Sequence, residues 1–74
     1  MGRDDVLEYL RQKPFQPFRL HLSTGAFFDV RQPQMANVER VTLTLAFPLE
    51  PERQRFAVIA LVHIVWLEIV VPAP

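Results

Sequence analysis

The chain has 74 residues, half of them hydrophobic, with eight basic residues balanced by eight acidic ones and no cysteine. This length suits a single domain, residues 1–74, and the zero net charge lacks the positive excess typical of proteins that bind nucleic acid or membrane surfaces. No disulfide can form without cysteine, and two histidines offer little ligand material for zinc, so we expect no metal and no cofactor.

The first predicted element is a helix over about residues 4–12. Asp4 or Asp5 can cap its N-terminus, and hydrophobic residues at positions 6, 7 and 10 form a stripe along one face. Pro14 ends the helix, because proline lacks the N–H that a helix interior needs. This N-terminal stretch is charged and has no apolar signal region, so we predict a cytoplasmic protein.

Two strands are expected next, over about residues 17–23 and 26–31, joined as a hairpin. Hydrophobic and polar side chains alternate from Phe18 to Ser23, which is the pattern of a strand with one buried face. Gly25 ends the polar turn between the strands and is expected to supply the positive φ that such a turn requires.

A loop over residues 32–39 leads to a third predicted strand, over about residues 40–47. In this strand Val41, Leu43 and Leu45 point one way, while the residues between them point the other way. Prolines and charged residues from Pro48 to Arg55 then predict an exposed turn.

The last part of the chain, FAVIALVHIVWLEIVV over residues 56–71, is almost continuously apolar. Since it carries His63 and Glu68 and is shorter than the roughly 20 residues that a membrane-spanning helix needs, we predict no membrane span. One extended strand of this length would reach about 50 Å, which is too long for a domain this small. We therefore predict two strands, over about residues 55–61 and 63–70, with a break at Leu61 to His63.

Apolar strands of this kind need cover on both faces, from a closed barrel or from another subunit. On our placement the inward residues are Phe56, Val58, Ala60, Val65, Leu67 and Ile69. Ile59, Trp66 and Val70 are then expected to face outward. Together with Phe27 they form a candidate oligomer interface, because exposed aromatic and aliphatic side chains often mark protein interfaces.

The layout of a helix, a hairpin with a Gly turn, a third strand, a charged loop and two closely linked strands resembles the Sm-like small barrel. FRLHLSTGAFFDV (residues 18–30) is similar to its first two strands and LVHIVWLEI (residues 61–69) to its last two. The resemblance implies a mainly β fold, in which an N-terminal helix precedes a five-stranded, strongly bent antiparallel barrel. It also implies a ring that holds single-stranded RNA, although the Arg-Gly pair of the RNA-holding positions has no match here.

The segment RQKPFQPFRLHLSTG (residues 11–25) also resembles a group of small bacterial proteins of unknown function that share a Pro-Phe-x-Pro-Phe-Arg opening. That resemblance implies no activity. Arg19, His21 and Arg31 are expected on the polar face of the hairpin, where they form a candidate site for an anion or a partner. The alternative is a solvated sheet face balanced by acidic residues.

Catalytic patterns are weak in this chain. With two glycines there is no glycine-rich phosphate loop, and a Ser/His/acid set assembled from Ser23, a histidine and Glu68 is one that any chain of this size offers. We predict a protein that is not an enzyme: a self-associating interaction module with an unidentified protein partner. The alternative is an Sm-like ring that binds single-stranded RNA.

Overall fold

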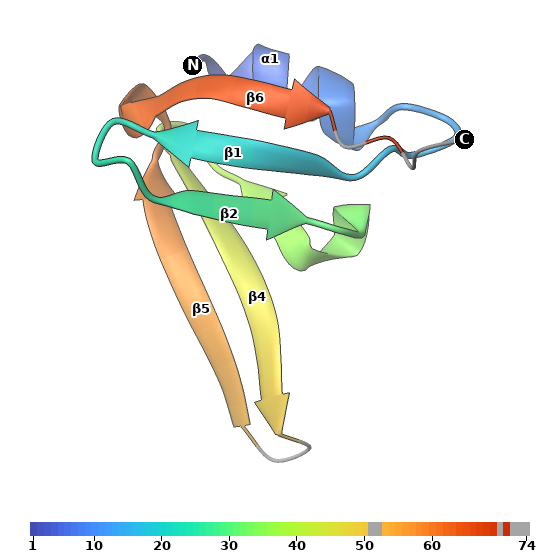
Figure 1. The fold of residues 1–74 in the computed structure, drawn as a ribbon, viewed down its shortest axis with the longest axis vertical. Coiled ribbons are helices and arrows are strands. Elements are labelled where there is room, and N and C mark those ends of the chain that lie inside the picture. The colour runs from blue at the N-terminus through green and yellow to red at the C-terminus, as the bar shows by residue number, and fades with distance from the viewer. Residues whose placement is uncertain (51–52, 70, 72–74) are drawn as a thin grey trace.

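The computed structural model describes residues 1–50, 53–69 and 71 and shows a mainly β protein with an N-terminal helix. Six strands in this part of the chain form two antiparallel sheets, with the strand orders β2-β1-β6 and β3-β4-β5 (Figure 1). In chain order the elements are α1 (Arg3–Leu10), β1 (Phe18–Leu22), β2 (Phe27–Val30), the 3-10 turn η1 (Pro33–Met35), β3 (Ala36–Val38), β4 (Thr42–Glu50), β5 (Arg53–Ala60), the 3-10 turn η2 (Leu61–His63) and β6 (Ile64–Ile69).

The two sheets do not close into the five-stranded barrel that the sequence led us to expect. β2 and β3 are successive segments separated by η1, and the long hairpin of β4 and β5 diverges from β2 (Figure 1). Pro33 starts η1 and so ends β2 early. Pro48, in β4, has no N–H to donate to a neighbouring strand. β2 and residues 46–48 of β4 are not paired with each other, because they belong to different sheets. We call the space between them the open seam.

Helix α1 is shorter than predicted and begins differently. Gly2 is the N-cap residue, where the sequence suggests Asp4 or Asp5, and the Gly2 N–H donates to Oδ2 of Asp5 at 3.2 Å. The helix ends at Leu10 instead of near residue 12. Val6, from the predicted apolar stripe, is buried in the core and so anchors the helix to the sheets.

The hairpin of β1 and β2 has the predicted turn. The Leu22 N–H donates to the Ala26 carbonyl at 2.9 Å, and the Gly25 N–H donates to the Leu22 carbonyl at 3.0 Å. Gly25 has a φ of 91°, in the left-handed region that favours glycine, so the expectation of a positive φ is confirmed.

The break at Leu61 to His63 is confirmed by η2, but the predicted facing of β5 is wrong by one residue. Ile59, expected to face outward, is buried and only 6% exposed, whereas Phe56 and Val58 are exposed. The reason is the register, which places Ile59 directly opposite the buried Leu43 of β4. Because both faces of β5 carry apolar residues, the sequence pattern did not reveal this register.

Strand β6 contains a local irregularity beside β1. Leu22 lies opposite Ile64 and His21 lies opposite Trp66, so Val65 is an extra residue on the β6 side, in the manner of a β-bulge. Val65 is accordingly 61% exposed, where an uninterrupted alternation predicts an inward side chain. Beyond the bulge Trp66 faces outward and Leu67 is partly buried, as expected, but Ile69, which was expected to face inward, is 38% exposed at the end of the strand.

The hydrophobic core is formed by side chains from both sheets, α1 and η2. Its buried residues are Val6, Phe18, Leu20, Val30, Leu43, Leu45, Ile59, Leu61 and Ile64. The amino group of Met1 donates to the carbonyls of Leu61 and Ile64, at 3.0 and 3.1 Å, beside this core. Within the described ranges, none of the helices combines the length and apolar character that crossing a membrane requires.

Candidate functional site

The outer face of the β2-β1-β6 sheet carries the polar and aromatic residues singled out from the sequence. Arg19 of β1 lies opposite Asp29 of β2 and Glu68 of β6, which makes a charged row across the sheet. Two residues further along β1, on the same face, His21 lies opposite Phe27 and Trp66, and we call these three residues the aromatic row. Cross-strand neighbours of this kind are close enough for their side chains to interact directly.

The aromatic row is built on a stack between the central strand β1 and the outer strand β6. The His21 and Trp66 rings are parallel, with centroids 3.8 Å apart and an interplanar angle of 3°. On the other side of His21, the Phe27 ring lies at 6.1 Å and is tilted by 44°. The Arg19 guanidinium carbon lies 4.1 Å from the centroid of the Phe27 ring, so a cation–π contact joins the two rows.

The three side chains of the charged row, one cation and two carboxylates, each have a polar partner on this sheet face. Arg19 donates to both carboxylate oxygens of Asp29, at 2.7 and 3.2 Å, and Nε2 of His21 lies 2.9 Å from Oε1 of Glu68. The Arg19 hydrogen bonds hold the pKa of the Asp29 carboxyl below its ordinary value of 3.8. Of the three predicted partner-contact residues, Arg19 and His21 thus already have carboxylate partners, while Arg31 is exposed at the end of β2.

The predicted oligomer-interface residues do not form one cluster. Phe27 and Trp66 are exposed on the same face, but they lie on the opposite edge strands β2 and β6. Ile59 belongs to the core, and Val70 lies outside the described residues. Only Trp66 therefore combines exposure with a position on the β6 edge.

The structure adds exposed apolar residues on β5 that sequence reasoning had assigned to the core. Phe56 and Val58 are solvent-exposed, and β5 is the outer strand of its sheet. On β6, Val65 and Ile69 are exposed beside Trp66. Exposed apolar residues therefore occur on β5 and β6, two strands at the edges of different sheets. The alternation in β4 was the sequence signal that could have shown the facing of β5. It identifies Leu43 and Leu45 as inward residues, and the residues of β5 that pair with them face inward too.

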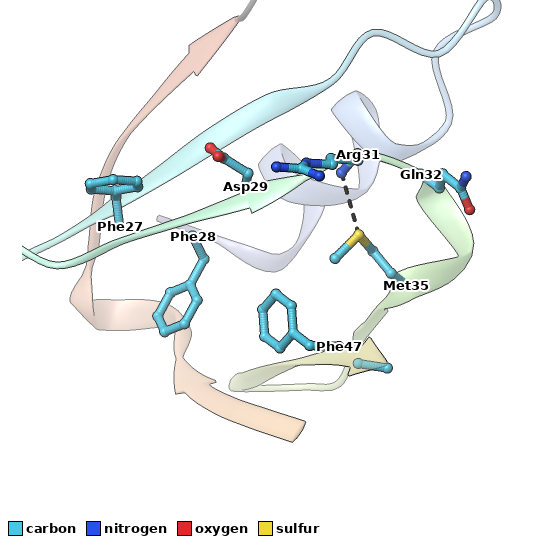
Figure 2. Close-up of a pocket in the computed structure, with 8 residues that line it drawn as sticks. Phe27, Phe28, Asp29, Arg31, Gln32, Met35 and Phe47 are labelled. Carbon is cyan, nitrogen blue, oxygen red and sulfur yellow. Dashed lines mark hydrogen bonds between the residues drawn. The ribbon is translucent and has the colours of Figure 1, made fainter. Parts of the chain in front are cut away.

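A cavity of about 590 Å³ occupies the open seam between β2 and β4 (Figure 2). Its walls include the Phe28 and Phe47 rings, with centroids 5.9 Å apart, and the Met35 side chain. The sulfur of Met35 accepts a hydrogen bond from the Arg31 backbone N–H at 3.3 Å, shown by the dashed line in Figure 2. Sequence reasoning missed this cavity because it exists only where the expected barrel fails to close.

The Ser/His/acid set considered from the sequence is not assembled. Oγ of Ser23 lies 3.1 Å from Nδ1 of His63, and both residues are exposed. Glu68 contacts His21 instead, so no carboxylate in the described part of the chain is seen to orient His63. Within the same residues, no three acidic, histidine or cysteine side chains lie close enough together to hold a metal ion.

Comparison of the chain with protein-family models, with curated proteins and with solved structures found no match. No relative therefore supplies an activity, a partner or a functional residue. A functional proposal for this chain has to rest on its own surfaces, namely the two rows on the outer sheet face, the exposed apolar residues on β5 and β6, and the open seam.

Proposed function

We propose that this protein is a non-enzymatic interaction module that self-associates by pairing the β5 edge of one copy with the β6 edge of the next. The observation that carries the proposal is the exposure of Phe56 and Val58 on β5 and of Trp66 on β6. Burying such side chains between subunits is favourable, at about 25 cal/mol per Å² of apolar surface removed from water. The backbone groups of an outer strand are a ready template for strand addition.

The aromatic row supports the choice of β6 as one of the two surfaces. His21 covers one face of the Trp66 indole, and Trp66 is still 51% exposed at the edge of its sheet. An aromatic side chain from an added strand can stack on the other indole face and so extend the row, and Phe56 is the exposed aromatic residue of β5.

Pairing β5 with β6 joins two different surfaces, so the contact is heterologous. Such contacts either close into rings or continue as filaments. The resemblance of the sequence to the Sm-like barrel supports the ring, and one copy can present both edges at once because β5 and β6 are outer strands of two different sheets. A ring that binds single-stranded RNA is less well supported, because Asp29 and Glu68 offset Arg19 and Arg31 on the outer face and leave no excess of positive charge there for phosphates.

The native mass in solution tests this proposal directly. We expect the wild-type chain to run as a single oligomeric species whose mass, measured by light scattering on a sizing column, is a whole-number multiple, two or more, of the 8.6 kDa of one chain. Trp66→Arg places a charge in the proposed interface and is expected to yield the monomer. Val41→Arg is the matched control, because Val41 is also an exposed apolar residue but lies outside β5 and β6, and it should keep the wild-type mass. A monomeric wild type, or a Trp66→Arg variant of unchanged mass, contradicts the proposal.

A further inference from the structure

We infer that the open seam is a docking site for an extended segment of another protein, with alternating apolar and acidic side chains, which adds as a strand to the free edge of β2. This inference concerns a different surface from the β5 and β6 edges and does not depend on self-association. It follows from three features of the seam: the direction of its backbone groups, its apolar wall and the two arginines, Arg19 and Arg31, that flank Asp29 beside it.

The pattern of hydrogen bonds between β1 and β2 leaves the N–H and C=O groups of alternate β2 residues pointing into the seam. The Leu22 N–H bonds to the Ala26 carbonyl, so the pair Leu20 and Phe28, two steps further along, is also a hydrogen-bonded pair. The residues between such pairs point their N–H and C=O groups away from the partner strand. Phe27 and Asp29 therefore present theirs to the side of β2 that is opposite to β1.

The same reasoning applies to the facing wall of the seam. The Glu39 N–H bonds to the Thr42 carbonyl, which directs the backbone groups of alternate β4 residues, Thr42, Thr44 and Ala46, toward the β3 side. β3 starts at Ala36, opposite Leu45, so Ala46 extends beyond it. The N–H and C=O groups of Ala46 thus face the seam across from β2, and Ala46 lines the cavity.

The side chains on the inner side of the seam favour apolar residues at the positions of the docked segment that contact them. Phe28 and Phe47 stack at 5.9 Å, and Met35 lies beside them in Figure 2. A strand added to β2 points every second side chain to this inner side. Those positions would contact the two rings and the thioether of Met35, whose flexible side chain adapts to different apolar partners.

The charge around the seam selects acidic residues. The Asp29 carboxylate accepts two hydrogen bonds from Arg19, and Arg31 also lies close enough to lower the pKa of this carboxyl, so two cations flank one carboxylate beside β2. Arg31 is exposed at the end of β2, two residues after Asp29, and it lines the cavity. Arg19 and Arg31 therefore favour carboxylates among the outward side chains of the docked segment. Strand β5 of a second copy carries Arg55 itself, so a like charge disfavours it as the occupant.

The test uses the full chain and the synthetic peptide acetyl-Glu-Val-Glu-Val-Glu-Val-Glu-amide. We expect saturable binding, with amide shifts in two-dimensional NMR centred on Phe27, Asp29 and Ala46. Two control peptides should bind at least about tenfold more weakly: one of equal composition with its three valines adjacent, and one N-methylated at alternate residues, which removes the donors that strand pairing needs. Equal affinity for either control, shifts centred elsewhere, or no binding up to about 1 mM overturns the inference.

Matched arginine variants test the charge argument. Arg31→Glu should weaken binding of the acidic peptide about fivefold and strengthen binding of its Lys-for-Glu counterpart, as expected for an exposed charge pair. Arg40→Glu, an exposed arginine in the turn between β3 and β4, should change neither affinity. Equal effects of the two variants contradict the assignment to the seam. The Trp66→Arg variant is expected to bind the peptide like the wild type, which separates a failure of this inference from a failure of the self-association proposal.

Discussion

His21 and Trp66 come from strands more than forty residues apart in the sequence, yet their rings stack face to face at 3.8 Å. The imidazole also lies 2.9 Å from Glu68 and 6.1 Å from the Phe27 ring, so it links β1 to both neighbouring strands. One exposed face of the sheet is therefore ordered by side-chain contacts as well as by backbone pairing.

Replacing His21 should expose the stacked indole face. We expect His21→Ala to shift the fluorescence emission of Trp66, the one tryptophan of the chain, to longer wavelength. It should also lower the free energy of unfolding by about 1 kcal/mol, as measured by urea denaturation. Phe27→Ala is the control, because Phe27 lies on the other side of His21 and its loss leaves the indole covered. An unchanged emission spectrum for His21→Ala would show that the stack does not persist in solution.

The ion pair of Arg19 and Asp29 should make stability depend on pH at the acid end. Since hydrogen bonds from Arg19 depress the pKa of Asp29 below 3.8, this contribution is complete above that value. It is lost as the pH falls through the lower folded-state pKa. Asp29→Asn should be less stable than the wild type by about 0.5 to 1 kcal/mol near neutral pH, and the difference should shrink below pH 3.8.

The matched control for that experiment is Asp4→Asn, because Asp4 is exposed in the first turn of α1 and has a charged partner only at 3.9 Å. It should follow the wild-type acid dependence in thermal melts taken across the same pH range. A constant difference between the wild type and Asp29→Asn at every pH would contradict the role given to the ion pair.

The facing of β5 can be tested by truncating two neighbouring residues. Ile59→Ala leaves a cavity in the core and should cost about 2 to 4 kcal/mol of unfolding free energy. In the Trp66→Arg background, where no subunit contact is expected to cover β5, Val58→Ala removes an exposed side chain and should cost less than about 0.5 kcal/mol. Chemical denaturation of both variants at one protein concentration gives the comparison. Equal losses, or the reverse order, would mean that β5 faces the other way.

The turn between β1 and β2 offers a test of backbone conformation alone. A Cβ added at Gly25 meets nothing within 4 Å, so Gly25→Ala introduces no clash. It should still destabilise the protein by about 1 kcal/mol, because alanine resists a positive φ. Gly25→Asn should cost less, since asparagine tolerates the left-handed region better. Thermal unfolding of the three proteins decides the order, and equal stability of Gly25→Ala and the wild type would argue against the turn geometry.

Local patterns in the sequence were enough to predict much of the fold. The alternation in β1, the glycine turn and the break at Leu61 to His63 each depend on neighbouring residues, and the structure shows all three. The facing of β5 and the closure of the barrel depend on register between distant strands. Ile59 shows the difficulty: both faces of its strand are apolar, so only its pairing with Leu43 identifies the core side.

The candidate site was predictable to a similar extent. Period-two alternation correctly placed Arg19, His21 and Trp66 on an outer face. The partners that neutralise and stack on them could not be inferred, because they depend on how β6 aligns with β1. The open seam could not be predicted for a different reason. It exists because β2 and β4 do not pair in the described structure, and no residue pattern signals a missing pairing.

The β-bulge at Val65 bears on how large an assembly can grow. A long, straight and apolar outer strand accepts further strands without limit and is a hazard for fibre formation. An extra residue near the start of β6 bends and twists the strand at that point, so the regular part available to an incoming strand is restricted to Trp66 through Ile69. We expect that deleting Val65 would straighten this edge and shift the protein from finite species toward precipitation. On this view, the one extra residue in β6 limits the protein to finite assemblies.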